Sequence, residues 1–141
     1  MIGDAIVDTA SKAYLAGIID GEGTVTLARK HRNELHSPEV SVANTNQRLI
    51  VWLKNKTGSG TICLKQKRSI KHRTAYTWKI RGDKAIALLK EISRWLIIKK
   101  PHADLILRDY KKLTPRNGRY DEQTLKEKMK LVALIRALNS R

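Results

Sequence analysis

Apolar residues recur along the chain with two different spacings, which predicts helices alternating with pairs of strands. Asp8 or Thr9 can cap a first helix over about residues 9–20. Residues 24–30 then alternate between apolar and polar, as in a strand with one buried face. A second alternating strand covers residues 39–43. The first strand points Val25 and Leu27 inward and the remaining residues outward, namely Thr24, Thr26, Ala28 and Lys30.

The middle of the chain repeats this order. Asn46 can cap a helix over residues 47–56, whose apolar residues keep helical spacing, and the Gly-Ser-Gly sequence at 58–60 ends it. Residues 61–65 and 76–80 alternate again. They predict a hairpin whose strands are joined by a basic loop.

Helices dominate the remainder. Asp83 begins a third helix with apolar positions as far as Leu96, and Pro101, a residue suited to a first helical turn, begins a fourth that runs to Lys112. Residues 114–118 form a turn, and a last amphipathic helix covers about residues 121–139. The length allows one domain, residues 1–141, with a core of ordinary size.

Charge is distributed unevenly along the chain. It holds 29 Lys and Arg against 13 Asp and Glu, a formal net charge of +16. Residues 1–28 nevertheless carry a net −3, since they contain one base and four acids, so the rest carries +19. Basic surface gains affinity for polyanions by releasing condensed counterions, which favours a nucleic-acid partner. Charge alone equally suits a ribosomal or a merely soluble basic protein.

The remaining composition excludes several classes of protein. No segment approaches the roughly 20 apolar residues of a membrane-spanning helix, and no signal peptide precedes the first helix. We therefore expect an intracellular protein, of the cytoplasm, the nucleoid or an organelle, with no membrane partner. Cys63 is the one cysteine, so the chain forms no internal disulfide and, with four scattered histidines, no Cys/His zinc cluster. We expect Cys63 to be a small strand residue.

The most specific pattern is the nonapeptide Leu-Ala-Gly-Ile-Ile-Asp-Gly-Glu-Gly at 15–23. Ala13, Gly17 and Gly21 share one helical face at four-residue steps, where small side chains let another backbone approach closely. Asp20 and Glu22 fall where the helix should end. Acids there oppose the helix dipole by roughly 0.3–1 kcal/mol, so a bound cation explains them better than helix stability does.

These nine residues resemble the signature of the LAGLIDADG homing endonucleases, with Ile18 for a leucine, Gly21 for an alanine and Glu22 for an aspartate. The predicted order of elements also matches that family's αββαββα order. The resemblance implies an α+β fold with a four-stranded antiparallel sheet that binds DNA, followed by additional C-terminal helices. Because the nonapeptide occurs once, it implies the homodimeric type, with Ala13, Gly17 and Gly21 at the dimer interface.

The same resemblance implies a metal site at the end of the signature helix. Hydrolysis of a phosphodiester needs an activated water and neutralisation of developing charge, which divalent ions held by carboxylates supply. Glu22 and the Gly21 carbonyl are the expected oxygen ligands. Mg²⁺ is the expected cofactor, and Mn²⁺ or Ca²⁺ are other ions that can bind. The alternative for Glu22 is a solvated acid in a turn.

Three more positions correspond to the surroundings of that family's active site. Lys99, before the fourth helix, matches a basic residue that can stabilise developing charge, and the alternative is a solvated Lys99–Lys100 pair. Asn44, at the end of the second strand, matches a polar residue that positions water, or it serves as a cap or turn residue. Asp20 ranks after Glu22 as a catalytic acid, and it can instead orient the helix ends or cap across the dimer interface.

DNA is expected to lie on the sheet, because a two-stranded ribbon fits the major groove, where base edges carry distinct donors and acceptors. Arg48, in the second helix, reaches phosphate or stays solvated. The outward strand residues predicted to contact DNA are Thr24, Thr26, Lys30, Ser41, Lys65, Thr77 and Lys79. Those in the flanking loops are Arg32, Lys67, Arg68, Lys71 and Arg73. The opposite face belongs to the core or stacks on bases, and comprises Tyr76, Trp78 and Ile80.

Together these features predict a Mg²⁺-dependent, site-specific endonuclease that makes a staggered break in double-stranded DNA at a long, nearly palindromic site. The family resemblance implies that it is encoded within an intron or a similar mobile element. One alternative is a catalytically reduced member of the same fold that acts as an RNA maturase or a DNA-binding regulator. Another is a basic RNA-binding protein, which accounts for the charge but not for the signature helix.

Overall fold

The computed structural model describes residues 8–65 and 74–140, apart from the Lys65 side chain. It confirms the α+β class and the predicted order of helices and strand pairs, with further helices at the C-terminal side. The elements are α2 (Thr9–Glu22), β1 (Gly23–Ala28), β2 (Ser37–Asn44), α3 (Gln47–Thr57), β3 (Thr61–Lys65), β4 (Ala75–Arg81), α4 (Gly82–Ile92), α5 (Lys100–Asp109) and α6 (Glu122–Asn139).

Three predicted boundaries were wrong. The first strand stops before Lys30, where the chain turns into the β1–β2 loop. The third helix ends at Ile92, and Leu96 follows a 3₁₀ turn, although it is still buried in the core. The fourth helix ends at Asp109, because the chain tightens into a second 3₁₀ turn before it reaches Thr114. Short 3₁₀ turns keep apolar residues at nearly helical spacing, so the sequence pattern did not reveal these ends.

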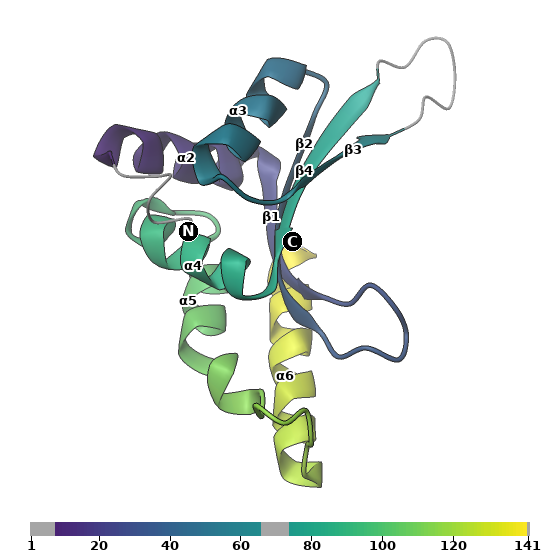
Figure 1. Ribbon diagram of the computed structural model, residues 1–141. Coiled ribbons are helices and arrows are strands. Elements are labelled where there is room, and N and C mark those ends of the chain that lie inside the picture. The colour runs from purple at the N-terminus through teal and green to yellow at the C-terminus, as the bar shows by residue number, and fades with distance from the viewer. Residues whose placement is uncertain (1–7, 66–73, 141) are drawn as a thin grey trace.

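The four strands form an antiparallel sheet in the order β1-β2-β4-β3, and α2, α3, α4 and α5 lie on one side of it (Figure 1). Register aligns Val25 with Val40, and Val42 with Trp78, on the face beneath the helices. Trp78 is fully buried, and its indole N–H donates to the Ser59 carbonyl at 3.0 Å. The core prediction for this face is therefore confirmed over a base-stacking role.

The signature helix α2 is held firmly on its inner side. Asp8 caps it by accepting the Ser11 N–H at 2.7 Å. Lys12 forms a 2.7 Å ion pair with Glu91 of α4. The buried residues of this inner side are Leu15, Ala16 and Ile19. Burial of such side chains contributes about 25 cal/mol per Å² of apolar surface, so the inner face of α2 anchors the helix to the core.

The C-terminal helix α6 is attached by a buried lysine. The Lys128 ammonium donates to the Tyr120 hydroxyl at 2.6 Å and lies 4.9 Å from the centroid of the Tyr110 ring. Burial raises the pKa of the Tyr110 phenol, so that ring stays neutral beneath the cation. These contacts offset the cost of burying a charge and join α6 to the turn after α5. In the described part of the chain, no helix has the length and apolar character that crossing a membrane requires.

Candidate metal and nucleic-acid site

The signature helix turns directly into β1. Its last helical hydrogen bond runs from the Gly23 N–H to the Ile19 carbonyl, which leaves the Gly21 carbonyl beyond that bond. A Cβ at Gly23 would lie 2.8 Å from the Ile19 Cα and 3.2 Å from the Ser41 carbonyl oxygen. The final glycine of the nonapeptide is therefore required by the close approach of β1 to α2 and β2.

Glu22 is exposed at this junction and is held by Asn44 from the end of β2. The Asn44 Nδ2 donates to Glu22 Oε2 at 2.8 Å, while the Asn44 Oδ1 accepts the Asn46 N–H at 2.8 Å. Because both ends of the amide are engaged, its orientation is fixed. The structure thus brings together two of the predicted catalytic residues and leaves Glu22 Oε1 available for another ligand.

Asp20 faces a different neighbour. Its two carboxylate oxygens accept the backbone N–H groups of Ile97 at 2.7 Å and Lys99 at 2.9 Å. These bonds tie the segment before α5 to the end of α2, within the same chain. Asp20 therefore orients the Lys99 segment, and both of its oxygens are already engaged.

Lys99 is half-buried at the start of α5. Its ammonium forms no ion pair with any described residue, whereas that of Lys100 lies 3.5 Å from the Asp104 carboxylate. His102, one turn further on, is buried, and desolvation followed by the charge of Lys99 lowers its pKa below the usual 6.5. The imidazole is thus neutral at pH 7, whereas Lys99, whose backbone N–H binds Asp20, carries a positive charge.

The oxygen atoms at this junction fit a hard divalent cation. Glu22 offers a carboxylate oxygen and Gly21 a carbonyl, and Mg²⁺ is commonly bound by one or two carboxylates with water and phosphate completing its shell. Among residues 8–65 and 74–140, no three His, Cys, Asp or Glu side chains gather into a ready-made metal cluster. Glu22 and the Gly21 carbonyl would by themselves make only part of the coordination shell of such an ion.

The open face of the sheet gathers most of the predicted strand contacts. Pairing aligns Thr24 with Ser41 and Ser41 with Lys79, and Thr26 and Thr77 lie on the same face. Lys30 was predicted there wrongly, because it lies with Arg32 in the β1–β2 loop, beyond the end of the strand. Lys65 is opposite Ala75 in the register. The predicted contacts Lys67, Arg68, Lys71 and Arg73 lie outside the described residues.

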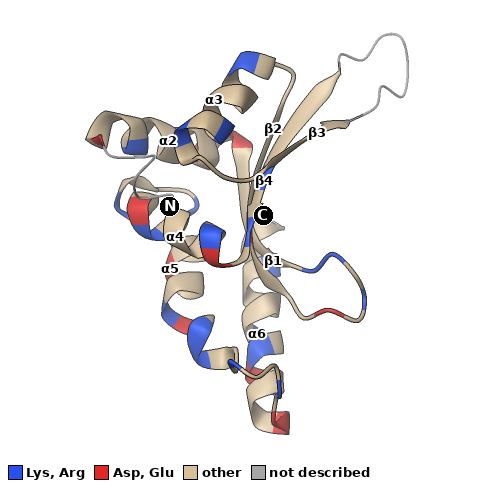
Figure 2. Ribbon diagram, viewed as in Figure 1, with Lys and Arg blue, Asp and Glu red and all other residues tan. Residues whose placement is uncertain are grey.

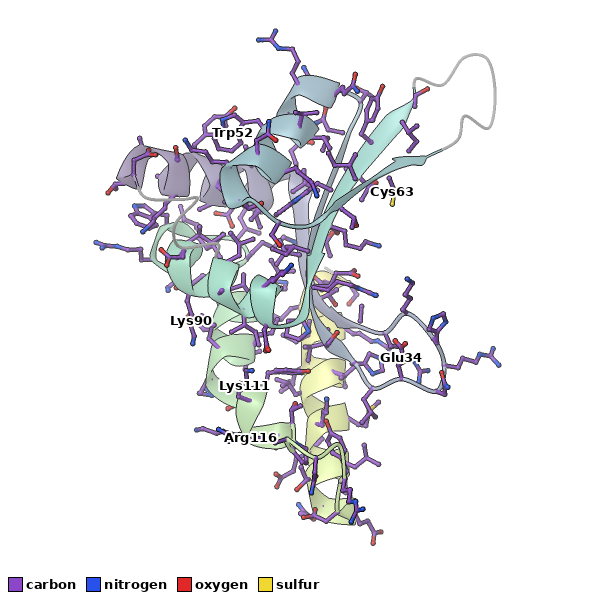
Figure 3. All side chains as sticks on the ribbon, in the orientation of Figure 1. Glu34, Trp52, Cys63, Lys90, Lys111 and Arg116 are labelled. Carbon is purple, nitrogen blue, oxygen red and sulfur yellow. The ribbon has the colours of Figure 1, made fainter. Side chains whose placement is uncertain are left out.

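Sequence reasoning missed further residues of this face. Register places Thr61 beside Lys79 and Cys63 beside Thr77, and Cys63 projects from β3 away from the helices (Figure 3). Glu39 and Arg81 also lie opposite one another on this face. Continuing the predicted strand alternation one residue beyond Ile80 would have found Arg81. Basic residues are not confined to the sheet but also occur along the helices and the β1–β2 loop (Figure 2).

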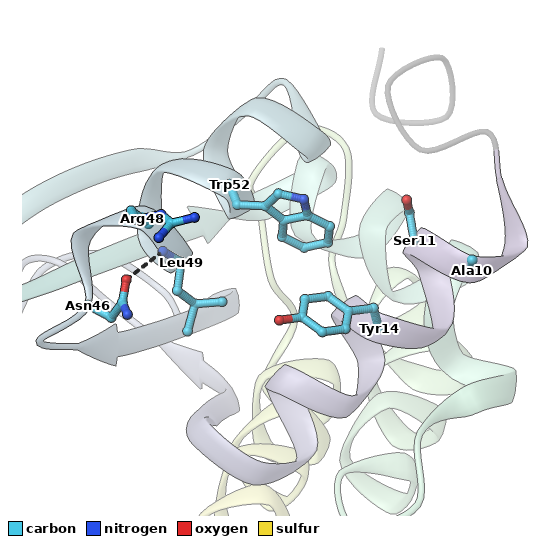
Figure 4. A pocket seen from close by; sticks show the side chains of 7 residues that line it. All are labelled: Ala10, Ser11, Tyr14, Asn46, Arg48, Leu49 and Trp52. Atoms are coloured by element: carbon cyan, nitrogen blue, oxygen red, sulfur yellow. Dashed lines mark hydrogen bonds between the residues drawn. The ribbon is translucent and has the colours of Figure 1, made fainter.

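A second surface follows the outer side of α2. Gly17 and Gly21 are exposed, and a Cβ added to either would meet nothing within 4 Å, whereas Ala13 is half-buried. Beside them a groove of about 690 Å³ separates α2 from α3 (Figure 4). Across it, the rings of Tyr14 and Trp52 meet edge to face with centroids 5.0 Å apart. Arg48 lines this groove on the helix side, and not the open face of the sheet.

The architecture is the LAGLIDADG homing endonuclease fold, which confirms the resemblance read from the nonapeptide at the level of fold. The chain superposes on the homing endonuclease I-CvuI in complex with its target in the presence of Ca, with a TM-score of 0.73, 20% identity and coverage of 92% of this chain and 82% of that one. It matches the archaeal intron-encoded homing endonuclease I-Vdi141I complexed with DNA with a TM-score of 0.70, 20% identity and coverage of 92% and 84%.

The LAGLIDADG homing endonuclease I-GzeII in complex with its DNA target gives a TM-score of 0.66 at 20% identity, over 86% of this chain and 43% of that longer chain. No family model matches the sequence, and no curated protein has a significant match to it. The likeness is therefore one of fold.

Proposed function

We propose that this chain is a site-specific DNA endonuclease of the LAGLIDADG homing type, encoded in an intron, which cuts both strands of a long, nearly palindromic site with a stagger. Its fold is shared with homing endonucleases solved on DNA. The observation that carries the proposal is the exposed Glu22, oriented by Asn44, beside a Lys99 segment held by Asp20. That arrangement leaves an acid open to a cation and ties the backbone of the Lys99 segment to the same end of α2.

In this proposal the residues at the end of α2 would hold a divalent ion, Mg²⁺ in the simplest case, which would supply charge neutralisation at the phosphate and a more acidic water. Glu22 and the Gly21 carbonyl bind it, and Asn44 keeps the Glu22 carboxylate in one orientation. Asp20 is a positioning residue, since it fixes the backbone from which Lys99 projects. The Lys99 ammonium stabilises negative charge that develops at the scissile phosphate.

The proposed enzyme is a homodimer formed through α2. One copy offers one four-stranded sheet and one exposed helix face, so a two-fold partner gives a second sheet for the other half of a palindromic site. Gly17 and Gly21 stand in open space where a second helix backbone can approach. The dimer would place two Glu22 carboxylates near the same short stretch of DNA.

DNA contacts are proposed for the open face. The strand residues Thr24, Thr26, Ser41, Thr77 and Lys79 supply hydrogen-bonding groups to base edges. Arg32 and Lys30 in the β1–β2 loop supply positive charge for phosphate. We propose the same role for Lys65 and for the basic residues predicted after it, on the sequence alone.

Iterative binding selection from randomised duplexes tests this function, followed by incubation of the selected duplexes with Mg²⁺ or with EDTA. We expect enrichment of one nearly palindromic sequence, cut on both strands at fixed positions in Mg²⁺ and left intact in EDTA. Selected duplexes that stay intact in Mg²⁺ would overturn the endonuclease proposal in favour of a DNA-binding regulator. Enrichment only from a parallel pool of structured RNA would favour a maturase or RNA-binding protein.

A further inference from the structure

An acidic residue lies on the open face of the sheet, where the proposed function expects a polyanion. Glu39 of β2 sits between Thr26 of β1 and Arg81 of β4 in the register. Its Oε1 accepts the Arg81 Nε–H at 2.7 Å and lies 3.8 Å from the Lys79 ammonium. A solvent-facing carboxylate here would repel DNA phosphate, so this carboxylate needs a different explanation.

Glu39 does not present its charge to solvent. Only 11% of its side chain is exposed, against 33% for Arg81 and 43% for Lys79. The two cations are more exposed than the acid and share one of its oxygens. Lys79 and Arg81 are two residues apart on one face of β4, roughly 7 Å along the strand, so a shared anion also relieves their mutual repulsion. The cluster keeps a net positive charge.

The choice of nitrogen matters for Arg81. The carboxylate takes Nε, and in the described part of the chain no hydrogen bond or ion pair engages the two terminal nitrogens. A guanidinium is planar and carries its donors in a fixed fork, so fixing Nε also fixes the plane of the terminal pair. Two parallel donors at that spacing match the O6 and N7 acceptors of guanine in the major groove.

We propose that Arg81 is a specificity-determining residue that binds a guanine through its two terminal nitrogens, and that Glu39 is the positioning residue that fixes its fork. The inference rests on the proposed function, because it assigns a base contact to the same DNA-binding face. It adds one specified base to each half-site, and in a two-fold dimer the guanine occurs at two mirror-related positions.

A direct role for Glu39 at a cytosine amino group is the competing assignment, since carboxylates accept from that group. The observed geometry disfavours it. Glu39 is nearly covered by the cations that it binds, whereas Arg81 extends further toward solvent from the same row of the sheet. A base edge therefore meets the guanidinium first.

The test compares binding to a selected duplex and to all of its single-base variants for the wild type and four variants. Arg81→Ala should reduce discrimination at one guanine of each half-site by about 5- to 150-fold, which is 1–3 kcal/mol converted at 1.4 kcal/mol per tenfold. Arg81→Lys keeps the charge but lacks the forked pair of donors, so it should also reduce discrimination at that guanine. Glu39→Gln should reduce this discrimination less, because the amide holds Nε more weakly. Arg94→Ala is the matched control, since Arg94 lies over the Trp95 ring away from the sheet.

An unchanged base profile for Arg81→Lys and Arg81→Ala would overturn the inference while leaving the proposed function in place. The inference would also be overturned if Glu39→Gln, and neither Arg81 variant, reduced discrimination at a cytosine. A wild-type protein that enriches no duplex overturns the proposed function and this inference with it. Circular dichroism at each binding temperature verifies that the variants are folded. If Arg81→Ala or Glu39→Gln unfolds, Arg81→Lys still tests whether the forked donors of Arg81 determine the base preference.

Discussion

Two glutamates near opposite ends of the β1–β2 strand pair differ in their exposure and in the charge of their partners. Glu39 is buried, with 11% of its side chain exposed, and lies within reach of two cations, Arg81 and Lys79. Glu22 is exposed, and its recorded partner among the described residues is the neutral amide of Asn44. The same side chain is thus electrostatically satisfied at one end of the sheet and left open at the other.

The difference supports the proposal that Glu22, and not Glu39, binds a ligand outside the chain. This protein has many spare cations, and a fold selected for stability alone could pair Glu22 as it pairs Glu39. Asn44 instead orients the carboxylate without neutralising it, which preserves its affinity for a positive ligand. An acid that is oriented but not paired is typical of a binding site.

The largest effect is expected when each of the two glutamates is neutralised in turn. Glu22→Gln keeps the shape but removes the charge that holds the metal, so we expect cleavage to fall roughly 10³-fold or more while DNA binding persists. Glu39→Gln should still cleave DNA, because we expect this change to alter the preference for one base pair and not the chemistry of cleavage. Both rates are measured on a selected duplex with Mg²⁺ in excess. Cleavage by Glu22→Gln at the wild-type rate would exclude the metal assignment.

The second expected effect concerns the outer side of α2. Gly17→Leu places a large side chain in the open space where the proposed dimer brings the partner helix, so we expect monomers or aggregates and little cleavage. Ala133→Leu on the exposed side of α6 is the control and should leave the oligomeric state unchanged. Sedimentation and cleavage are measured together. A monomeric wild type that still cuts both strands is incompatible with the homodimer.

The two neighbouring lysines before α5 offer a matched pair. Lys99→Met should slow cleavage by roughly 10²–10³-fold, as expected for loss of a charge aimed at the transition state. Lys100→Met removes an equal charge whose partner is Asp104, and should slow cleavage far less. Single-turnover rates at saturating protein separate this effect from DNA affinity. Equal losses in the two variants would assign both lysines to general attraction of DNA.

A smaller effect is expected for the amide that orients Glu22. Asn44→Ala removes one hydrogen bond to the carboxylate and should lower cleavage or metal affinity by roughly 10–100-fold. Raising the Mg²⁺ concentration should recover part of the lost rate if orientation of the ligand is the cause. A rate that is insensitive to Mg²⁺ would instead support the water-positioning role predicted from the sequence.

The smallest effect concerns a buried histidine, His36, in the β1–β2 loop. Burial, with Arg29 and Arg136 nearby, lowers the pKa of His36 below 6.5. The unfolded chain then binds a proton more readily than the folded chain, so stability should decrease as pH falls below about 6.5. Urea titrations between pH 5 and 8 should show a flatter dependence for His36→Gln. His31→Gln, an exposed position in the same loop, should behave as the wild type.

The sequence predicted the helices and strands better than the residues at which they end. The spacing of apolar residues and the capping residues sufficed for α2 and α3, where Asp8 and Asn46 cap as expected. The nonapeptide predicted a site at Glu22 and the family resemblance added Asn44, and the structure joins these two residues by a hydrogen bond. The partners of Asp20 were out of reach, since Ile97 and Lys99 meet it only when the chain folds back after α4. The pairing of Glu39 with Arg81 likewise depends on strand register, which composition does not specify.

The bonds made by Asp20 separate two kinds of information within one motif. Its carboxylate closes the chain onto itself at Ile97 and Lys99, so its loss should disturb any protein with this fold, whatever that protein does. Glu22 makes no such internal closure. If the proposed nuclease activity is correct, the acid at 20 should therefore persist in descendants that lost it, under selection for folding, while the acid at 22 should drift. In sequence comparisons, position 20 would then report ancestry and position 22 would report whether the activity is retained.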